Sequence, residues 1–204
     1  MMALYSSENC LDCHRVRFVL AEKGINVEII HVEQDRAASA DLAELNPYGE
    51  TPTLVDKDLK LYGTWVVTEY LDERYPHPPL MPVDPLSRAY LRLAMYRINR
   101  DWIEPAKIIE TSSGQKKVAS AKKQLRESII ASDDLFGLRT FLLSDELSLV
   151  DCALVPLLWR LPAYGVDLTA KKAPNTLKYM ERMFARDSFK RSLTEPERIL
   201  REGE

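Results

Sequence analysis

The chain has 204 residues, of which 46% are hydrophobic and 29% are charged, and these values are close to globular averages. They exclude a disordered or fibrous chain, and the length predicts one or two folded domains. The net charge of −3 supplies no overall positive field for wrapping nucleic acid, and no apolar run reaches the roughly 18 residues that span a bilayer.

The first part of the chain alternates strand patterns with helix patterns. Residues 3–5 form a short predicted strand, and the helix after it ends at Gly24, because glycine is favoured just beyond a helix end. Residues 27–32 predict a second strand, which we expect to be largely buried, and residues 37–45 predict a second helix. The chain therefore begins with the order βαβα.

A hairpin and a third helix complete this first part. Residues 53–55 and 59–62 form the predicted hairpin, because only a short polar connection separates them. A third helix runs from Thr64 to Arg74, with Thr64 as a candidate cap. The order βαβαββα, with parallel and antiparallel pairs in one sheet, is typical of the thioredoxin-like fold.

Prolines mark the end of this part, because residues 75–85 hold five of the twelve prolines of the chain. Proline removes a backbone donor and disfavours helix in the residue before it. We predict a thioredoxin-like domain at 1–77, a stiff proline-rich linker at 78–86 and an all-helical domain at 87–204. Its helices are expected at 86–109, 118–136, 149–164 and 175–185, followed by a short tail helix.

Cys10 and Cys13 form a C-x-x-C motif between the first strand and the first helix. The positive end of a helix dipole favours a thiolate there, whereas Asp12 opposes ionisation and Arg15 favours it. The motif fits either a redox or nucleophilic thiol or two small residues at a helix start. Three cysteines without a signal peptide favour a reducing compartment, so we expect a cytoplasmic protein, and we predict no metal site.

Thr51-Pro52 comes directly before the third strand. Proline is tolerated there because the backbone hydrogen bonds of the strand begin only after Pro52. In a thioredoxin-like fold a cis proline at this place exposes the preceding backbone groups to a peptide ligand. We therefore predict a cis Thr51–Pro52 bond, although few X-Pro bonds in folded proteins are cis.

This domain order, together with Pro52 and a capping box formed by Ser148 and Asp151, resembles the glutathione S-transferase superfamily over essentially the whole chain. The resemblance implies a glutathione site that includes Cys10, Cys13, Thr51 and Pro52.

The superfamily binds the γ-glutamyl group with an acidic residue followed by Ser at the start of the third helix. Here that pair is Gly63-Thr64, so a hydroxyl is kept but the partner for the ligand's ammonium is missing. We expect a vestigial glutathione site, no cofactor and no catalytic residue. The alternative is a glutathione-dependent thiol transferase that uses Cys10.

Several longer segments resemble the stringent starvation protein A family, which has the transferase fold. The resemblance implies a cytoplasmic, non-enzymatic transcription regulator of the stringent and stationary-phase stress response. It also implies binding to RNA polymerase holoenzyme including its sigma subunit, indirect access to promoter DNA, and a homodimer that pairs the sheet domain of one subunit with the helical domain of the other. The segments are 16–24, 53–56, 70–83, 142–146, 148–152 and 157–162.

The same resemblance implies that Pro76, His77, Pro78 and Pro79 form the surface that engages the polymerase. A proline-locked segment loses little conformational entropy on docking, and it presents flat apolar rings around one imidazole. Composition alone fits a rigid interdomain spacer instead. Relatives commonly have an aromatic residue after Met-Pro-Val where this chain has Asp84, and we expect that difference to alter the contact.

Overall fold

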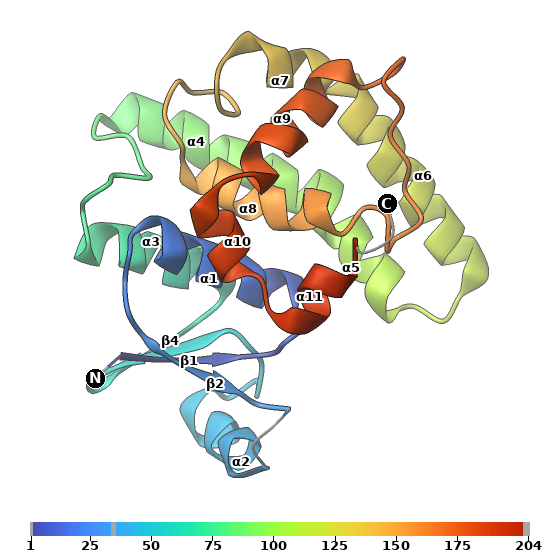
Figure 1. Ribbon diagram of the computed structural model, residues 1–204. Helices are drawn as coiled ribbons and strands as arrows, with labels where there is room; N and C mark the ends of the chain where they lie inside the picture. Colours follow the sequence, from blue (N-terminus) through green and yellow to red (C-terminus); the bar gives the residue numbers. More distant parts are fainter. Residues whose placement is uncertain (1, 34–35, 202–204) are drawn as a thin grey trace. The chain divides into compact units, whose positions relative to one another are not determined.

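The computed structural model describes residues 2–33 and 36–201, with the side chains of residues 36–38 outside the description. The described chain divides into two compact units (Figure 1). The first unit contains the residues up to Pro79 together with Asp187–Ile199. The second contains Leu80–Arg186 and the end of the chain after Ile199.

A four-stranded mixed sheet forms the centre of the first unit, with strand order β2-β1-β3-β4. β1 pairs parallel with β2 and antiparallel with β3, and β3 pairs antiparallel with β4. Helix α2 covers one face of the sheet, while α1 and α3 cover the other (Figure 1). The predicted thioredoxin-like order βαβαββα is confirmed by β1 (Met2–Ser6), α1 (Leu11–Glu22), β2 (Glu28–His31), α2 (Arg36–Leu45), β3 (Thr53–Asp56), β4 (Leu59–Tyr62) and α3 (Thr64–Arg74).

Two local expectations about these elements are wrong. β2 is an edge strand, so Glu28 and Ile29 are exposed and Ile30 is only half-buried. An apolar strand pattern does not reveal whether a strand has a neighbour on both sides, which is why its burial was overestimated. Thr64 is the first residue of α3 rather than its cap, and Gly63 occupies the cap position without a side-chain hydrogen bond.

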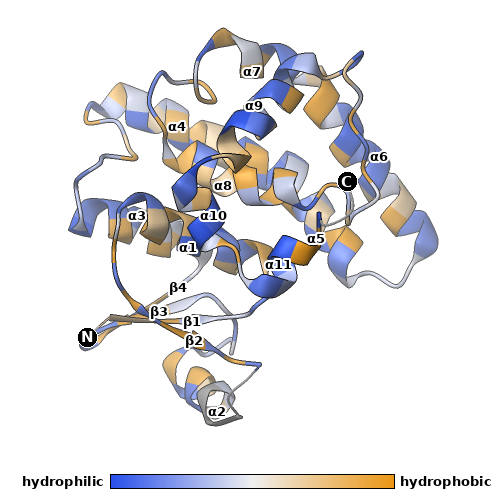
Figure 2. Ribbon diagram, viewed as in Figure 1, coloured by the Kyte–Doolittle hydropathy of each residue, from blue (hydrophilic) through white to orange (hydrophobic). Residues whose placement is uncertain are grey.

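The second unit is built from helices, and its predicted long helices are interrupted. The predicted segment 86–109 contains a π-helical turn, and the segment 118–136 is divided into two helices. The capping box is confirmed at α8, a helix that is apolar on all sides and stands out in Figure 2. The elements are α4 (Pro85–Ile98), the π-helical turn η1 (Asn99–Ile103), α5 (Glu104–Thr111), α6 (Gln115–Ala131), α7 (Asp133–Leu138), α8 (Leu149–Trp159) and α9 (Pro174–Phe184).

Residues 187–199, which we call the C-terminal strap, belong to the first unit, whereas the sequence placed them in the helical domain 87–204. The strap consists of α10 (Asp187–Ser192) and α11 (Glu195–Ile199). The Phe189 ring packs edge-on against Phe18 of α1, with 5.3 Å between centroids. A helical pattern in residues 187–199 gives no information about this partner, which lies far away in the sequence.

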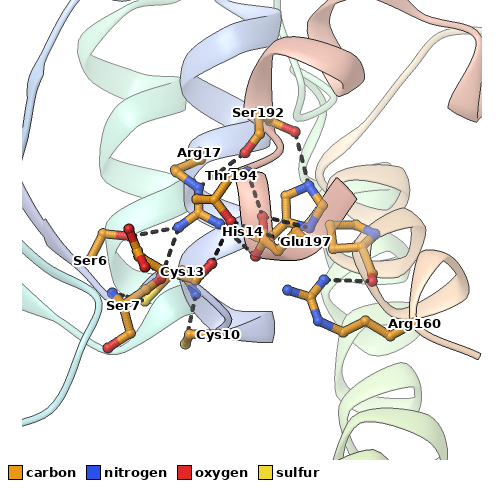
Figure 3. A network of polar contacts seen from close by, with 12 residues as sticks. Ser6, Ser7, Cys10, Cys13, His14, Arg17, Arg160, Ser192, Thr194 and Glu197 are labelled. Atoms are coloured by element: carbon orange, nitrogen blue, oxygen red, sulfur yellow. Dashed lines mark hydrogen bonds and ion pairs between the residues drawn. The ribbon is translucent and has the colours of Figure 1, made fainter. Parts of the chain in front are cut away.

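A buried ion pair fixes the strap to α1 (Figure 3). Arg17 Nη2 donates to Glu197 Oε1 at 2.6 Å, and the two side chains are only 4% and 0% exposed. Arg17 Nε donates to the carbonyl oxygen of Ser192 at 3.1 Å, and Nη1 donates to Ser6 Oγ at 2.6 Å. The guanidinium therefore joins β1, α1 and both helices of the strap through one set of hydrogen bonds.

We predict that Glu197→Gln destabilises the protein, because it leaves the buried Arg17 charge without its carboxylate. The free energy of unfolding is expected to fall by about 3 kcal/mol. Urea unfolding followed by circular dichroism measures the change. The matched control is Glu195→Gln in the same helix, where the Arg198–Glu195 pair is 52% and 73% exposed. Its effect is expected to stay within about 0.5 kcal/mol, and equal effects of the two variants would contradict the prediction.

Candidate functional site

The two thiols of the C-x-x-C motif lie at the first turn of α1 (Figure 3). Cys10 occupies the N-cap position with an extended backbone, and its Sγ accepts the amide of Cys13 at 3.2 Å. Cys13 is fully buried, and its Sγ accepts the amide of Ser7 at 3.3 Å. Cys10 is half-buried, and both thiols are free. The pair therefore has one reachable sulfur and one that is enclosed.

The environment separates the pKa values of the two thiols. Burial opposes the Cys13 thiolate, but hydrogen bonds from Cys10, Thr51 and Ser7 and the charge of Arg17 outweigh it, so the pKa of Cys13 is lowered to about 7. The hydrogen bond to Cys13, burial and repulsion by the Cys13 thiolate raise the pKa of Cys10. At Cys10 these effects outweigh the helix dipole, which in the sequence is opposed by the charge of Asp12.

The charged residues beside the motif act only partly as predicted. Repulsion by Asp12 contributes to raising the pKa of Cys10, in agreement with the sequence reasoning. Arg15, expected to favour a thiolate, instead donates through Nη1 to Asp12 Oδ1 at 2.8 Å. The guanidinium that favours the Cys13 thiolate is that of Arg17, one turn further along the helix.

The loop before β3 brings a second group of polar atoms to the thiols. The Thr51–Pro52 peptide bond is cis, as predicted, and Pro52 is buried. Ser7 Oγ and Thr51 Oγ1 lie 2.8 Å apart, and both residues also hydrogen-bond to Cys13. The structure thus brings together Cys10, Cys13, Thr51 and Pro52, the thiol end of the glutathione site that the sequence resemblance implies.

The start of α3 carries the other part of that implied site. Gly63 has a φ of 82° and a ψ of 115°, in the region that favours glycine, so an acidic side chain at this position is strained. Thr64 follows as the first helical residue and is half-buried. This backbone conformation is therefore better suited to the glycine at position 63 than to an acidic residue.

Pro76, His77, Pro78 and Pro79 are all exposed, in a segment that follows α3. The His77–Pro78 peptide bond is also cis, which the sequence reasoning missed. Asp84, placed by sequence in the same candidate surface, belongs to the second unit and caps α4. Its Oδ1 accepts the amide of Ser87 at 2.8 Å, and hydrogen bonds from Ser87 lower the pKa of Asp84.

Lys23 binds the backbone on both sides of His77, a role that no sequence pattern indicated. Its side chain is fully buried at the end of α1, and its ammonium has three partners. Nζ donates to the carbonyl oxygens of Tyr75 at 2.6 Å and Pro78 at 2.7 Å, and it pairs with Asp72 Oδ1 at 2.7 Å. A lysine before a helix-ending glycine is typical of a solvent-facing residue, so only the structure reveals the contacts.

Within residues 2–33 and 36–201, no group of three or more His, Cys, Asp or Glu side chains is arranged to hold a metal ion. Helices in the same ranges are all too short or too polar to cross a membrane.

The chain is similar to known proteins along most of its length. Models of the glutathione S-transferase N-terminal and C-terminal domains match residues 4–79 and 89–187. A stringent starvation protein A homolog of Coxiella burnetii is 47% identical over 202 residues, which cover 99% of this chain and 96% of that protein. A homolog of the same description from Pasteurella multocida is also 47% identical, over 95% of this chain and 90% of that protein.

Solved structures agree on the fold. A glutathione S-transferase from Methylobacillus flagellatus, with GSH bound, has a TM-score of 0.82 and 24% sequence identity. The match covers 95% of this chain and 100% of that one, and at this identity it shows the fold alone.

We predict that one thiol of the reduced protein titrates near pH 7. Because the pKa of Cys13 is lowered to about 7, its thiol is neutral below that pH and ionised above it. Thiolate absorbance at 240 nm should rise with a midpoint near pH 7, and Cys13→Ser should remove this transition. Cys152→Ser is the control, since Cys152 is buried in α8, and it should leave the transition unchanged. A first transition at the free-cysteine value of about 8.5 would contradict the prediction.

Proposed function

Because this chain belongs to the stringent starvation protein A family, we propose that it is an RNA polymerase-associated transcription regulator and not a transferase. In this proposal the exposed segment Pro76–Pro79 binds RNA polymerase holoenzyme, including its sigma subunit, and promoter DNA is reached only through the polymerase. The observation that carries the proposal within the molecule is the exposed proline segment whose backbone Lys23 holds from the buried side.

The way this segment is held suits a docking surface. Three of its four residues are prolines, whose φ is fixed by the ring. Lys23 binds the carbonyl oxygens of Tyr75 and Pro78, on both sides of His77, so the backbone is ordered before a partner arrives. Little conformational entropy then remains to be lost on binding, while the imidazole and the proline rings stay exposed to solvent.

The thiol end of the site argues against transferase chemistry. A glutathione transferase of the thiol type needs an accessible thiolate and an anchor for the γ-glutamyl group. The reachable thiol, Cys10, has a raised pKa, and Gly63 supplies no acidic side chain. The retained cis Pro52 beside a low-pKa Cys13 favours the second candidate, a glutathione-dependent thiol transferase. Retention on immobilised glutathione, without binding to polymerase, would select this second candidate.

We predict that His77→Ala disrupts binding to RNA polymerase holoenzyme. Truncation of a central docking residue is expected to weaken the complex by about 30-fold, which corresponds to the roughly 2 kcal/mol typical of such residues. Because His77 is exposed, the melting temperature should stay within about 2 °C of the wild-type value. Biolayer interferometry with immobilised holoenzyme measures binding, and differential scanning fluorimetry measures the melting temperature.

A pair of proline variants sharpens this test. Pro79→Ala should weaken binding in the same direction, whereas Pro47→Ala, at another exposed proline of the first unit, should leave it unchanged. Unaltered binding by His77→Ala and Pro79→Ala would contradict the docking proposal. A parallel loss of binding and melting temperature would favour the rigid-spacer interpretation.

The proposed regulator is also a homodimer, and two exposed apolar surfaces support this pairing. On α4, Leu86, Tyr90 and Leu93 are 66%, 65% and 54% exposed, and their spacing puts them on one side of the helix. In the first unit, Tyr48 and Val66 are 71% and 50% exposed. We propose that the α4 surface of one subunit packs against the surface that carries Tyr48 and Val66 on the other subunit.

Charge is compatible with this arrangement. Residues 1–77 carry 14 acidic and 7 basic side chains, whereas residues 78–204 carry 17 acidic and 21 basic side chains. A negative sheet unit facing a positive helical unit of another subunit is favourable, and two such contacts related by a twofold axis close a dimer.

We predict that Tyr90→Glu combined with Leu93→Glu yields a monomer, because two carboxylates cannot be buried in an apolar interface at low cost. Size-exclusion chromatography with light scattering measures the mass. The control is Leu138→Glu on α7, where the side chain is 69% exposed but lies outside the proposed interface. It should remain dimeric, and a dimeric double variant would contradict the proposed contact.

A further inference from the structure

We propose that Cys10 and Cys13 form a redox-active dithiol, which closes to an intramolecular disulfide when it meets a low-molecular-weight disulfide such as oxidised glutathione. Neither thiol takes part in the polymerase docking proposed above, so this is a separate activity of the first unit. The substrate class is a small disulfide that is reduced to two thiols.

The positions of the two cysteines suit a bond between them. Cys10 is the N-cap residue and Cys13 lies in the first turn of α1. The Cys10 sulfur is already turned toward Cys13, since it accepts the Cys13 amide at 3.2 Å, and the two thiols hydrogen-bond to one another. A disulfide needs Cβ atoms about 3.5–4.5 Å apart, closer than residues three apart on a regular helix, so closure requires a small backbone shift at the extended N-cap residue Cys10.

The two sulfurs differ in access in the way that such a reaction requires. Cys10 is half-buried, so an external disulfide can reach its sulfur, whereas Cys13 is fully buried and can react only with a sulfur already inside the site. Ser7 donates its amide to the Cys13 sulfur and Arg17 lies close enough to favour a charge there. Cys10 is thus the entry thiol and Cys13 the thiol that resolves the intermediate.

The reaction balances without a further reactant. The pair first loses one proton to solvent, which leaves the charge on Cys13. As the Cys10 sulfur attacks one sulfur of the small disulfide, its proton passes to the Cys13 thiolate. A Cys10–glutathione mixed disulfide forms, and one glutathione thiolate leaves. Cys13 then loses its proton and attacks the Cys10 sulfur, which forms the Cys10–Cys13 bond and expels the second glutathione thiolate. Two electrons pass from the protein to the small disulfide, and two molecules of reduced glutathione result.

The contacts of Arg17 indicate that closure leaves the fold intact. Its guanidinium is held by Glu197, Ser192 and Ser6, and these contacts involve neither sulfur. Loss of the Cys13 charge on oxidation therefore removes one favourable interaction of Arg17 but keeps its hydrogen bonds. We expect the oxidised protein to remain folded, which allows the reaction to be followed on the native protein.

The experiment incubates the full chain with excess oxidised glutathione at pH 7.5, quenches with acid, alkylates the remaining thiols under denaturing conditions and maps the products by mass spectrometry. Wild type should contain a Cys10–Cys13 disulfide and one alkylated thiol, at Cys152. Cys13→Ser should stop at a mixed disulfide on residue 10, and Cys10→Ser should react at least tenfold more slowly. Cys152→Ser should behave as wild type does, because Cys152 is buried in α8.

Three results would overturn the proposal. These are a wild-type chain that keeps both thiols free, one that accumulates a stable mixed disulfide, and one in which Cys152 or a second chain supplies the partner sulfur. Binding to polymerase, measured on the same samples, distinguishes failure here from failure of the proposed regulator. A dithiol that does not close leaves polymerase binding untouched, and loss of polymerase binding by His77→Ala leaves disulfide formation untouched.

Discussion

Burial of helix α1 is the constraint on which the first unit depends. From Cys13 to Leu20 every residue of this helix is buried, yet the stretch includes the polar and charged side chains His14, Arg15 and Arg17. A buried charge is tolerated only with a partner, so the helix requires polar groups from elsewhere in the chain. Arg17 obtains them from β1 and the C-terminal strap, and Lys23, at the helix end, obtains them from the segment around Tyr75.

The two ends of α1 therefore support two different kinds of site. At the amino end, free amides and the Arg17 charge act on a pair of thiols beside a cis proline. At the carboxyl end, the Lys23 ammonium fixes the backbone that leads into the exposed prolines. The thiol pair and the proline segment thus depend on side chains at opposite ends of one helix.

Features set by neighbouring residues were predictable, whereas features set by distant pairs were not. The βαβαββα order and the capping box at Ser148 follow from local patterns, and the cis bond before Pro52 was predicted from the thioredoxin-like order; all three are confirmed. The edge position of β2 and the π-helical turn η1 depend on neighbours that local patterns do not encode. The cysteines and prolines were singled out in the sequence as candidate site residues, whereas Lys23, which binds the backbone of the proline segment, looks in sequence like an ordinary surface lysine.

The C-terminal strap has a consequence for how the protein is made. The ribosome synthesises Glu197 only after the whole of Leu80–Arg186, so the sheet unit stays incomplete while that stretch is translated. At typical rates of translation this interval lasts about 5 to 20 s. During that time the Arg17 guanidinium lacks its Glu197 partner and the Phe18 side chain lacks the Phe189 ring that later packs against it. The sheet unit can therefore be completed only after the helical unit has been synthesised, and a chain cut short before α11 lacks the carboxylate partner of Arg17.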